Sequence, residues 1–81
     1  MITHAGQVGR DPRVVHFALE HPTVSGHHLD VKPTARGLEV VNRGRSTTVN
    51  GAQLAKDAAA VLSAGDVLVL GEVVLKVEVT T

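Results

Sequence analysis

Cysteine, tryptophan and tyrosine are absent from the 81-residue sequence, and Phe17 is its single phenylalanine. Without cysteine, a disulfide-stapled mini-protein and a zinc site with cysteine ligands are both excluded. The scarcity of aromatic rings also excludes domains that stack nucleic-acid bases on aromatic side chains. Acidic and basic residues balance at a formal net charge of +0, so there is no general attraction to nucleic acid or acidic lipid. We therefore expect no nucleic-acid partner.

Long apolar runs are also absent. No stretch of about 18 apolar residues exists, so we expect no membrane span. The first eleven residues lack the charged start and apolar stretch of a signal peptide. Together with the absence of cysteine, these features are compatible with a cytoplasmic protein. A chain of 81 residues predicts one domain over residues 1–81, either as it stands or as a module of a longer protein.

Valine is abundant, with 15 copies, and favours a β protein with an aliphatic core. Residues 73, 75, 77 and 79 are apolar, with Lys76 and Glu78 between the last three, as in a strand with one buried face. The expected strands are Val14–Leu19, His28–Lys32, Leu38–Val41, a short one ending near Leu62, Val67–Leu70 and Val73–Val79. We expect hairpin connections at residues 33–37 and 71–72. Residues 53–62 suit a helix by composition, but their β surroundings favour a loop or one helical turn near residues 55–59.

No catalytic constellation is visible, so we expect no enzyme and no catalytic residue. The sequence has no cysteine nucleophile, no Gly-x-Ser-x-Gly elbow and no P-loop. Ser25 and His28 are too close along one loop for the usual nucleophile and base. Three histidines, His21, His27 and His28, raise the alternative of a metal site. Their spacing favours structural and surface roles instead, so we expect no metal and no cofactor.

Four loops carry the informative residues. A β-sandwich gathers alternate loops at one end, which predicts that Arg10, Ser25, Arg43 and Arg45 lie together. Arginine matches the oxygens of a phosphate, a serine hydroxyl adds a donor, and glycine-rich turns present backbone N–H groups to anions. The alternative is that Arg43 and Arg45 are solvated loop charges.

These motifs, in this order, resemble a forkhead-associated (FHA) domain. The series is Gly9-Arg10, Ser25-x-x-His28, Val49-Asn50-Gly51, then Leu62-x-x-Gly65-Asp66 with Leu70-Gly71, and it covers about Val8 to Val79. The resemblance implies an all-β sandwich of the SMAD/FHA type, with eleven strands, Greek-key-like antiparallel connections and a site formed by loops at one end. It further implies binding of phosphothreonine peptides and no enzymatic activity.

The resemblance implies a role for each matching residue. Arg10 and Ser25 correspond to the phosphate-binding arginine and serine. Structural support is implied for Gly9, His28, Asn50 and Gly51. Gly26, Arg43, Gly44 and Arg45 would contact the peptide.

The loop before Asn50-Gly51 departs from the family pattern Ser-x-Asn-Gly-Thr-x-Val-Asn-Gly. Arg45 stands where the family has an asparagine that binds the peptide main chain, and Ser46 replaces a glycine. Gly44 stands where a hydroxyl residue often touches phosphate, and Gly26 lacks the polar or basic side chain often found there. A guanidinium only donates, whereas an amide also accepts, so Arg45 cannot reproduce both contacts. Arg45 either compensates by reaching the phosphate or an acidic side chain, or obstructs the pocket.

Two functions follow from this comparison. The first is a phosphothreonine-dependent interaction module in signalling or regulation, whose partner is a phosphothreonine-containing protein or peptide. The alternative is a degenerate FHA domain that binds its partner independently of phosphorylation.

Overall fold

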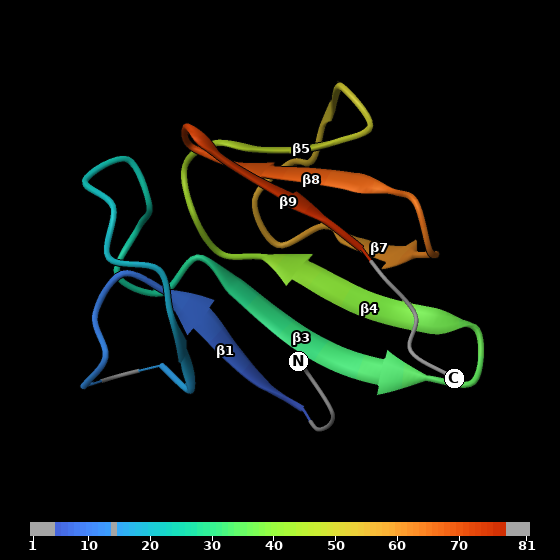
Figure 1. Cartoon of the computed structure of the whole chain (residues 1–81), viewed down its shortest axis with the longest axis horizontal. Helices are drawn as coiled ribbons and strands as arrows, with labels where there is room; N and C mark the ends of the chain where they lie inside the picture. Colours follow the sequence, from blue (N-terminus) through green and yellow to red (C-terminus); the bar gives the residue numbers. More distant parts are fainter. Residues whose placement is uncertain (1–4, 14, 78–81) are drawn as a thin grey trace.

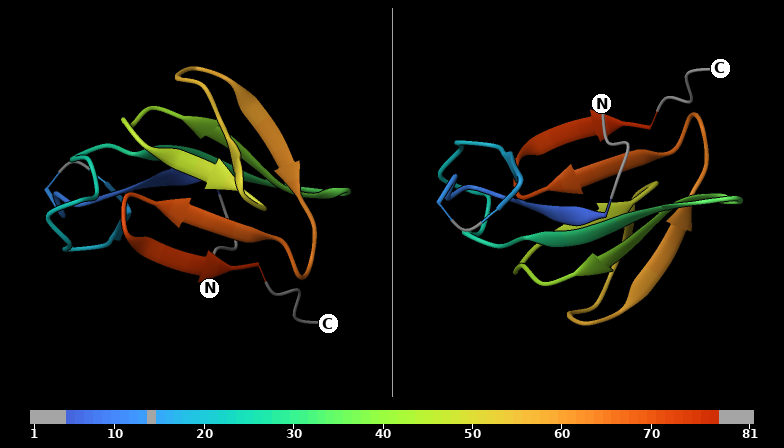
Figure 2. Two further views of the ribbon diagram at one scale, coloured as in Figure 1. Left: turned by 90° about the horizontal axis from the view of Figure 1, so that it is seen from above. Right: turned by 90° about the horizontal axis from the view of Figure 1, so that it is seen from below.

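Two β-sheets face each other across an aliphatic core in the computed structural model, which describes residues 5–13 and 15–77 (Figures 1 and 2). The first sheet has the order β2-β1-β3-β4-β7, and the second has the order β6-β5-β8-β9. The first comprises β1 (Gly6–Gly9), β2 (Phe17–Ala18), β3 (Leu29–Thr34), β4 (Gly37–Asn42) and β7 (Ala59–Leu62). The second comprises β5 (Thr47–Val49), β6 (Ala52–Gln53), β8 (Val67–Leu70) and β9 (Val73–Lys76). Every pairing is antiparallel except that of β1 with β2.

The core confirms the expectation of aliphatic packing. Alternate residues of the strands face inward, as in β3, where Leu29 and Val31 are buried while Lys32 is exposed. The buried apolar residues are Val8, Val24, Leu29, Val31, Val40, Leu62, Leu68 and Leu70. Phe17 is only partly buried against this cluster. The all-β sandwich predicted from the sequence is therefore confirmed.

Several predicted elements agree with the structure. Strand β8 matches Val67–Leu70, β7 ends at Leu62, and Gly71-Glu72 turns between β8 and β9. Inward and outward positions alternate over residues 73–77, although β9 ends at Lys76. The predicted end of this strand at Val79 lies outside the described residues. Residues 54–58 form no helix, and no segment among residues 5–13 and 15–77 is a helix long and apolar enough to cross a membrane.

Two expectations about the strands need correction. The strand predicted over Val14–Leu19 is only the two-residue β2, and Val14 itself is outside the described residues. The N–H of Val15 donates to the carbonyl of Asp11 in a turn, which keeps this segment out of the sheet. The described residues form nine strands, fewer than the eleven that the resemblance implied.

The β3–β4 hairpin is tighter than the loop predicted at residues 33–37. Its strands extend to Thr34 and from Gly37, so Pro33 pairs opposite Leu38 within the ladder. In the described part of the chain, β1 accompanies β3 only along Leu29–Val31. Pro33 therefore occupies an edge stretch, where its missing N–H costs no ladder bond on the open side.

Candidate phosphate-binding site

A hollow of about 490 Å³ opens at one end of the sandwich. Figure 1 shows the loops that follow β1, β2 and β4 gathered at this end, while the β3–β4 and β7–β8 turns lie at the other. The lining residues are Arg10, Pro22, Thr23, Val24, Ser25, Gly26 and Arg45. The hollow therefore unites side chains from three loops that are distant in sequence.

Ser25 is held from three directions. Its carbonyl accepts the N–H of Arg10 at 2.9 Å, and its own N–H donates to Nδ1 of His28 at 2.9 Å. Its hydroxyl oxygen lies 3.4 Å from the N–H of Arg45, which donates to it. Because the oxygen accepts this bond, the hydroxyl proton remains available to a ligand in the hollow.

His28 belongs to a buried chain of hydrogen bonds beneath the hollow. Since Nδ1 accepts from Ser25, the ring proton is on Nε2, which lies 2.8 Å from Oγ1 of Thr47 and 3.0 Å from the carbonyl of Ser46. The Thr47 hydroxyl then donates to Oδ1 of Asn42 at 2.7 Å. Burial lowers the pKa of His28, which favours this neutral ring, although the bond to the Ser46 carbonyl acts in the opposite direction.

The same network of hydrogen bonds anchors the loop after β4. Asn42 donates from Nδ2 to the carbonyl of Leu54 at 2.8 Å and accepts the N–H of Gly44 on Oδ1 at 3.1 Å. His28, Asn42 and Thr47 have exposed fractions of only 0%, 1% and 1%. Among the described residues, no buried side-chain nitrogen or oxygen lacks a hydrogen-bond partner. The network therefore joins the Ser25 loop and the loop after β4 to the second sheet, without an unsatisfied polar atom among the described residues.

Two glycines allow backbones to approach closely at this end. A Cβ on Gly9 would lie 2.2 Å from the carbonyl oxygen of Gly26, so β1 supports the Ser25 loop directly. A Cβ on Gly44 would lie 2.5 Å from Cδ2 of His28. The loop after β4 thus rests on the imidazole ring, and no side chain fits at position 44 in this arrangement. Gly44 is not among the residues that line the hollow.

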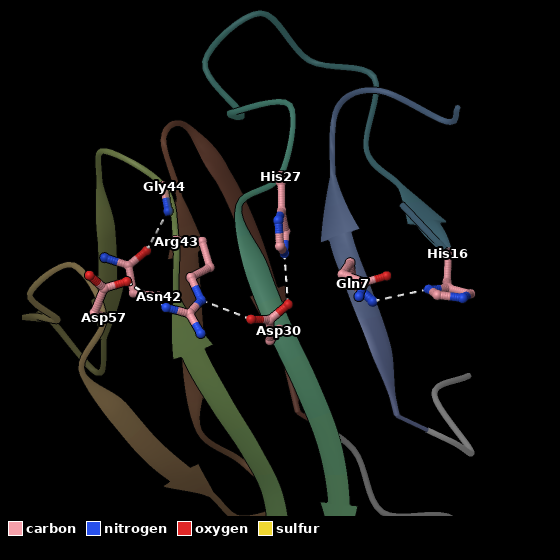
Figure 3. A network of polar contacts seen from close by, with 8 residues as sticks. All are labelled: Gln7, His16, His27, Asp30, Asn42, Arg43, Gly44 and Asp57. Carbon is pink, nitrogen blue, oxygen red and sulfur yellow. Dashed lines mark hydrogen bonds and ion pairs between the residues drawn. The ribbon is translucent and has the colours of Figure 1, made fainter. Parts of the chain in front are cut away.

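The sequence predicted that Arg43 lies together with Arg10, Ser25 and Arg45. In the structure, Arg43 does not line the hollow. Its guanidinium is 2.8 Å from Oδ2 of Asp30 and 2.6 Å from Oδ1 of Asp57 (Figure 3). These carboxylates raise the pKa of Arg43. Burial alone would raise the pKa of Asp30, but hydrogen bonds from Arg43 and His27 hold it below the usual value. The ion pairs draw Arg43 onto the outer face of the first sheet.

Arg10 and Arg45 differ from Arg43 in their electrostatic surroundings. Neither guanidinium lies within 4.0 Å of a carboxylate of the described residues. Arg10 donates from Nη1 to the carbonyl of Pro22 at 3.3 Å, a neutral acceptor on the rim of the hollow. Two positively charged side chains, neither in an ion pair with the described residues, therefore share one concave surface with the hydroxyl of Ser25.

The remaining predicted residues have separate positions. His21 and His27 bond to Thr23 and Asp30 respectively, and no group of three potential metal ligands occurs among residues 5–13 and 15–77. Asn50 and Gly51 form the two-residue turn between β5 and β6, with φ values of 51° and 84°. The Asn50 side chain accepts from the N–H of Val67 at 2.8 Å, away from the hollow.

Sequence reasoning did not identify several residues of this site. Pro22 and Thr23 line the hollow, and Oγ1 of Thr23 accepts the N–H of Glu72 at 2.9 Å, which ties this loop to the β8–β9 turn. Thr47 coincides with the threonine of the family pattern, so a signal for it was present. The contact of Arg43 with Asp57 carries no local signal, because it depends on the pairing of β4 with β7.

Comparison with known proteins agrees with this geometry. The family model described as FHA domain matches residues 6–71. The FHA-2 domain of the Mycobacterium tuberculosis ABC transporter Rv1747 is 32% identical, with a TM-score of 0.73 over 95% of this chain and 69% of that one. The FHA domain of CT664 from Chlamydia trachomatis is 21% identical, with a TM-score of 0.84 over 95% and 77% of the two chains.

A third similar structure contains a ligand. It is the N-terminal FHA domain of S. cerevisiae Rad53p in complex with a phosphothreonine peptide, 23% identical, with a TM-score of 0.70 over 83% of this chain and 56% of that one. No curated protein sequence matches the chain at a significant level. The family match over most of the chain, the nine-stranded arrangement of the described residues and the similar structures lead to one conclusion: the chain belongs to the forkhead-associated (FHA) family.

Proposed function

We propose that this chain is a phosphothreonine-dependent protein-interaction module in which Arg10 and Ser25 bind the phosphate. The observation that carries the proposal is a pair of arginines, neither in an ion pair with the described residues, that line the same hollow as Ser25. A phosphothreonine brings about −1.5 to −2 charges and three acceptor oxygens, which match these donors. The peptide-bound Rad53p domain is a precedent for such a ligand in the same fold.

The donors around Ser25 suit a phosphate in number and direction. The Arg10 guanidinium supplies charged N–H groups, and the Ser25 hydroxyl supplies an O–H whose oxygen is already bonded to Arg45. Gly26 adds a backbone position without a side chain, and a Cβ placed there would meet nothing within 4 Å. Gly9 and His28 hold this loop, while Gly44 and Arg43 hold the loop that presents Arg45. We further propose that the module acts in signalling or regulation in the cytoplasm.

The test is titration of a phosphothreonine peptide library into the protein and two arginine variants. Arg10→Ala removes charge-assisted hydrogen bonds to the phosphate and should weaken the selected peptides about ten- to a hundredfold. Arg36→Ala is the matched control, because Arg36 is exposed in the β3–β4 turn, does not line the hollow and forms no ion pair with the described residues. Equal affinity of wild type and Arg10→Ala would overturn the phosphate-binding role.

A second function is phosphorylation-independent binding of a partner. It is favoured by one observation, that no amide side chain lines the hollow. Asn42 and Asn50 are both engaged in hydrogen bonds within the fold. A site without an amide forms fewer hydrogen bonds with the peptide main chain. The affinity then comes either mainly from the phosphate or from contacts that do not involve a phosphate. Equal affinity for phosphorylated and unphosphorylated forms of a partner supports this second function.

A further inference from the structure

We propose that Arg45 is a second phosphate ligand, so that Arg10 and Arg45 clamp one phosphate next to Ser25. This inference rests on the proposed function and assigns a role to the residue that departs most from the family pattern. It predicts a site whose affinity comes mainly from the phosphate and whose selectivity for the flanking peptide residues is low. The ligand class is a dianionic phosphothreonine in varied sequence contexts.

The backbone places both arginines next to Ser25. The N–H of Arg10 is bonded to the Ser25 carbonyl at 2.9 Å, and the N–H of Arg45 approaches the Ser25 hydroxyl oxygen at 3.4 Å. A phosphate that accepts a hydrogen bond from this hydroxyl is therefore adjacent to both residues. Their long side chains line the same hollow. Two guanidinium groups can therefore reach one anion in this hollow.

The charges of the hollow balance those of a single phosphate. Arg10 and Arg45 contribute two formal positive charges, and no carboxylate of the described residues lies within ion-pair distance of either. Phosphothreonine brings about −1.5 to −2 charges near pH 7, so one group neutralises both arginines. Each guanidinium can donate two parallel hydrogen bonds to phosphate oxygens. If Arg45 bound a neutral peptide carbonyl instead of the phosphate, its positive charge would have no negative partner in the ligand.

The loop that carries Arg45 is well anchored for such a contact. On one side of Arg45, Arg43 is fixed to Asp30 and Asp57, and Gly44 rests on the His28 ring. On the other side, the Thr47 side chain is buried in its hydrogen-bond chain. Arg45 itself is exposed between these anchors. Anchoring of the neighbouring residues reduces the entropy lost when the side chain closes on a ligand.

The experiment compares a phosphothreonine peptide with blocked phosphothreonine, the single residue carrying an acetylated amino group and an amidated carboxyl group. Binding of both to wild type, Arg45→Ala and Arg45→Asn is measured by chemical-shift titration. If Arg45 binds the phosphate, Arg45→Ala weakens both ligands by the same factor, about tenfold. Arg45→Asn, which restores the family residue, should weaken blocked phosphothreonine similarly while recovering part of the peptide affinity through the main chain.

Two results would overturn the clamp. In the first, Arg45→Ala weakens the peptide but leaves blocked phosphothreonine unchanged, which assigns Arg45 to a peptide group beyond the phosphate. In the second, neither ligand is affected. Arg36→Ala again serves as the matched control for loss of one exposed positive charge. Failure of the proposed function gives a different result, since wild type would then not bind blocked phosphothreonine.

Discussion

Replacement of Thr47 by valine tests the buried hydrogen-bond chain beneath the site. Valine preserves the shape of the side chain but removes a hydroxyl that accepts from His28 at 2.8 Å and donates to Asn42 at 2.7 Å. The ring N–H retains the carbonyl of Ser46 at 3.0 Å, and Oδ1 of Asn42 retains the N–H of Gly44 at 3.1 Å. Neither partner is left without a bond, so the expected cost is that of two hydrogen bonds.

Two hydrogen bonds correspond to about 1–3 kcal/mol in the free energy of unfolding. A domain of this size has a total stability of roughly 4–12 kcal/mol, so the loss is a substantial fraction. The melting temperature should fall by roughly 5–20 °C. Because the chain contains neither tryptophan nor tyrosine, unfolding is followed by far-ultraviolet circular dichroism in thermal and urea titrations.

Thr48→Val provides the matched control. Thr48 is the next residue of β5, is only half-buried, and makes no side-chain hydrogen bond with the described residues. The same chemical change there should leave stability within about 0.5 kcal/mol, since surface substitutions away from special features usually do. If Thr47→Val costs no more than Thr48→Val, the hydrogen-bond chain does not stabilise the fold and the reasoning is refuted.

Three further predictions concern the loops and pH. Gly44→Ala should destabilise the protein by about 1–3 kcal/mol in urea titrations, because its Cβ meets the His28 ring, whereas Gly26→Ala should not, since its Cβ meets nothing within 4 Å. Arg43→Ala should weaken phosphothreonine peptides about two- to fivefold in calorimetric titrations by releasing the Arg45 loop from two exposed ion pairs, and unchanged affinity would contradict this positioning role. Because burial lowers the pKa of His28 below the usual 6.5, the unfolded chain binds a proton there before the folded chain does. The free energy of unfolding should therefore fall as pH drops below about 6.5, and His28→Gln should reduce this dependence in urea titrations at successive pH values.

The fold class and several strands were predictable because their signals are local. Alternation of apolar residues indicated the strand after Glu72, and the predicted turn at Gly71-Glu72 lies between β8 and β9. Strands β1, β5 and β6 were not predicted. The short β2 was not predictable from apolar content, since the turn at Asp11 and Val15 removes most of that segment from the sheet. Local propensity decides where a strand can form, but pairing with β1 decides how much of it does.

The site was predictable in part for the same reason. Arg10, Ser25 and Arg45 meet because alternate loops of a sandwich lie at one end, a property of the fold rather than of any single residue. The position of Arg43 depends on Asp30 and Asp57, which are 13 and 14 residues away in sequence and approach it only through strand register. A sequence pattern identifies charged loop residues, but it does not predict which of them form ion pairs within the protein.

The most direct test of the central claim is calorimetric titration of one phosphothreonine peptide, selected from the library, before and after treatment with a phosphatase. The account predicts binding before treatment and at least about tenfold weaker binding afterwards, because the phosphate supplies the charge that Arg10 and Arg45 match. Equal binding of the two forms would contradict phosphothreonine dependence and favour a docking role independent of phosphorylation.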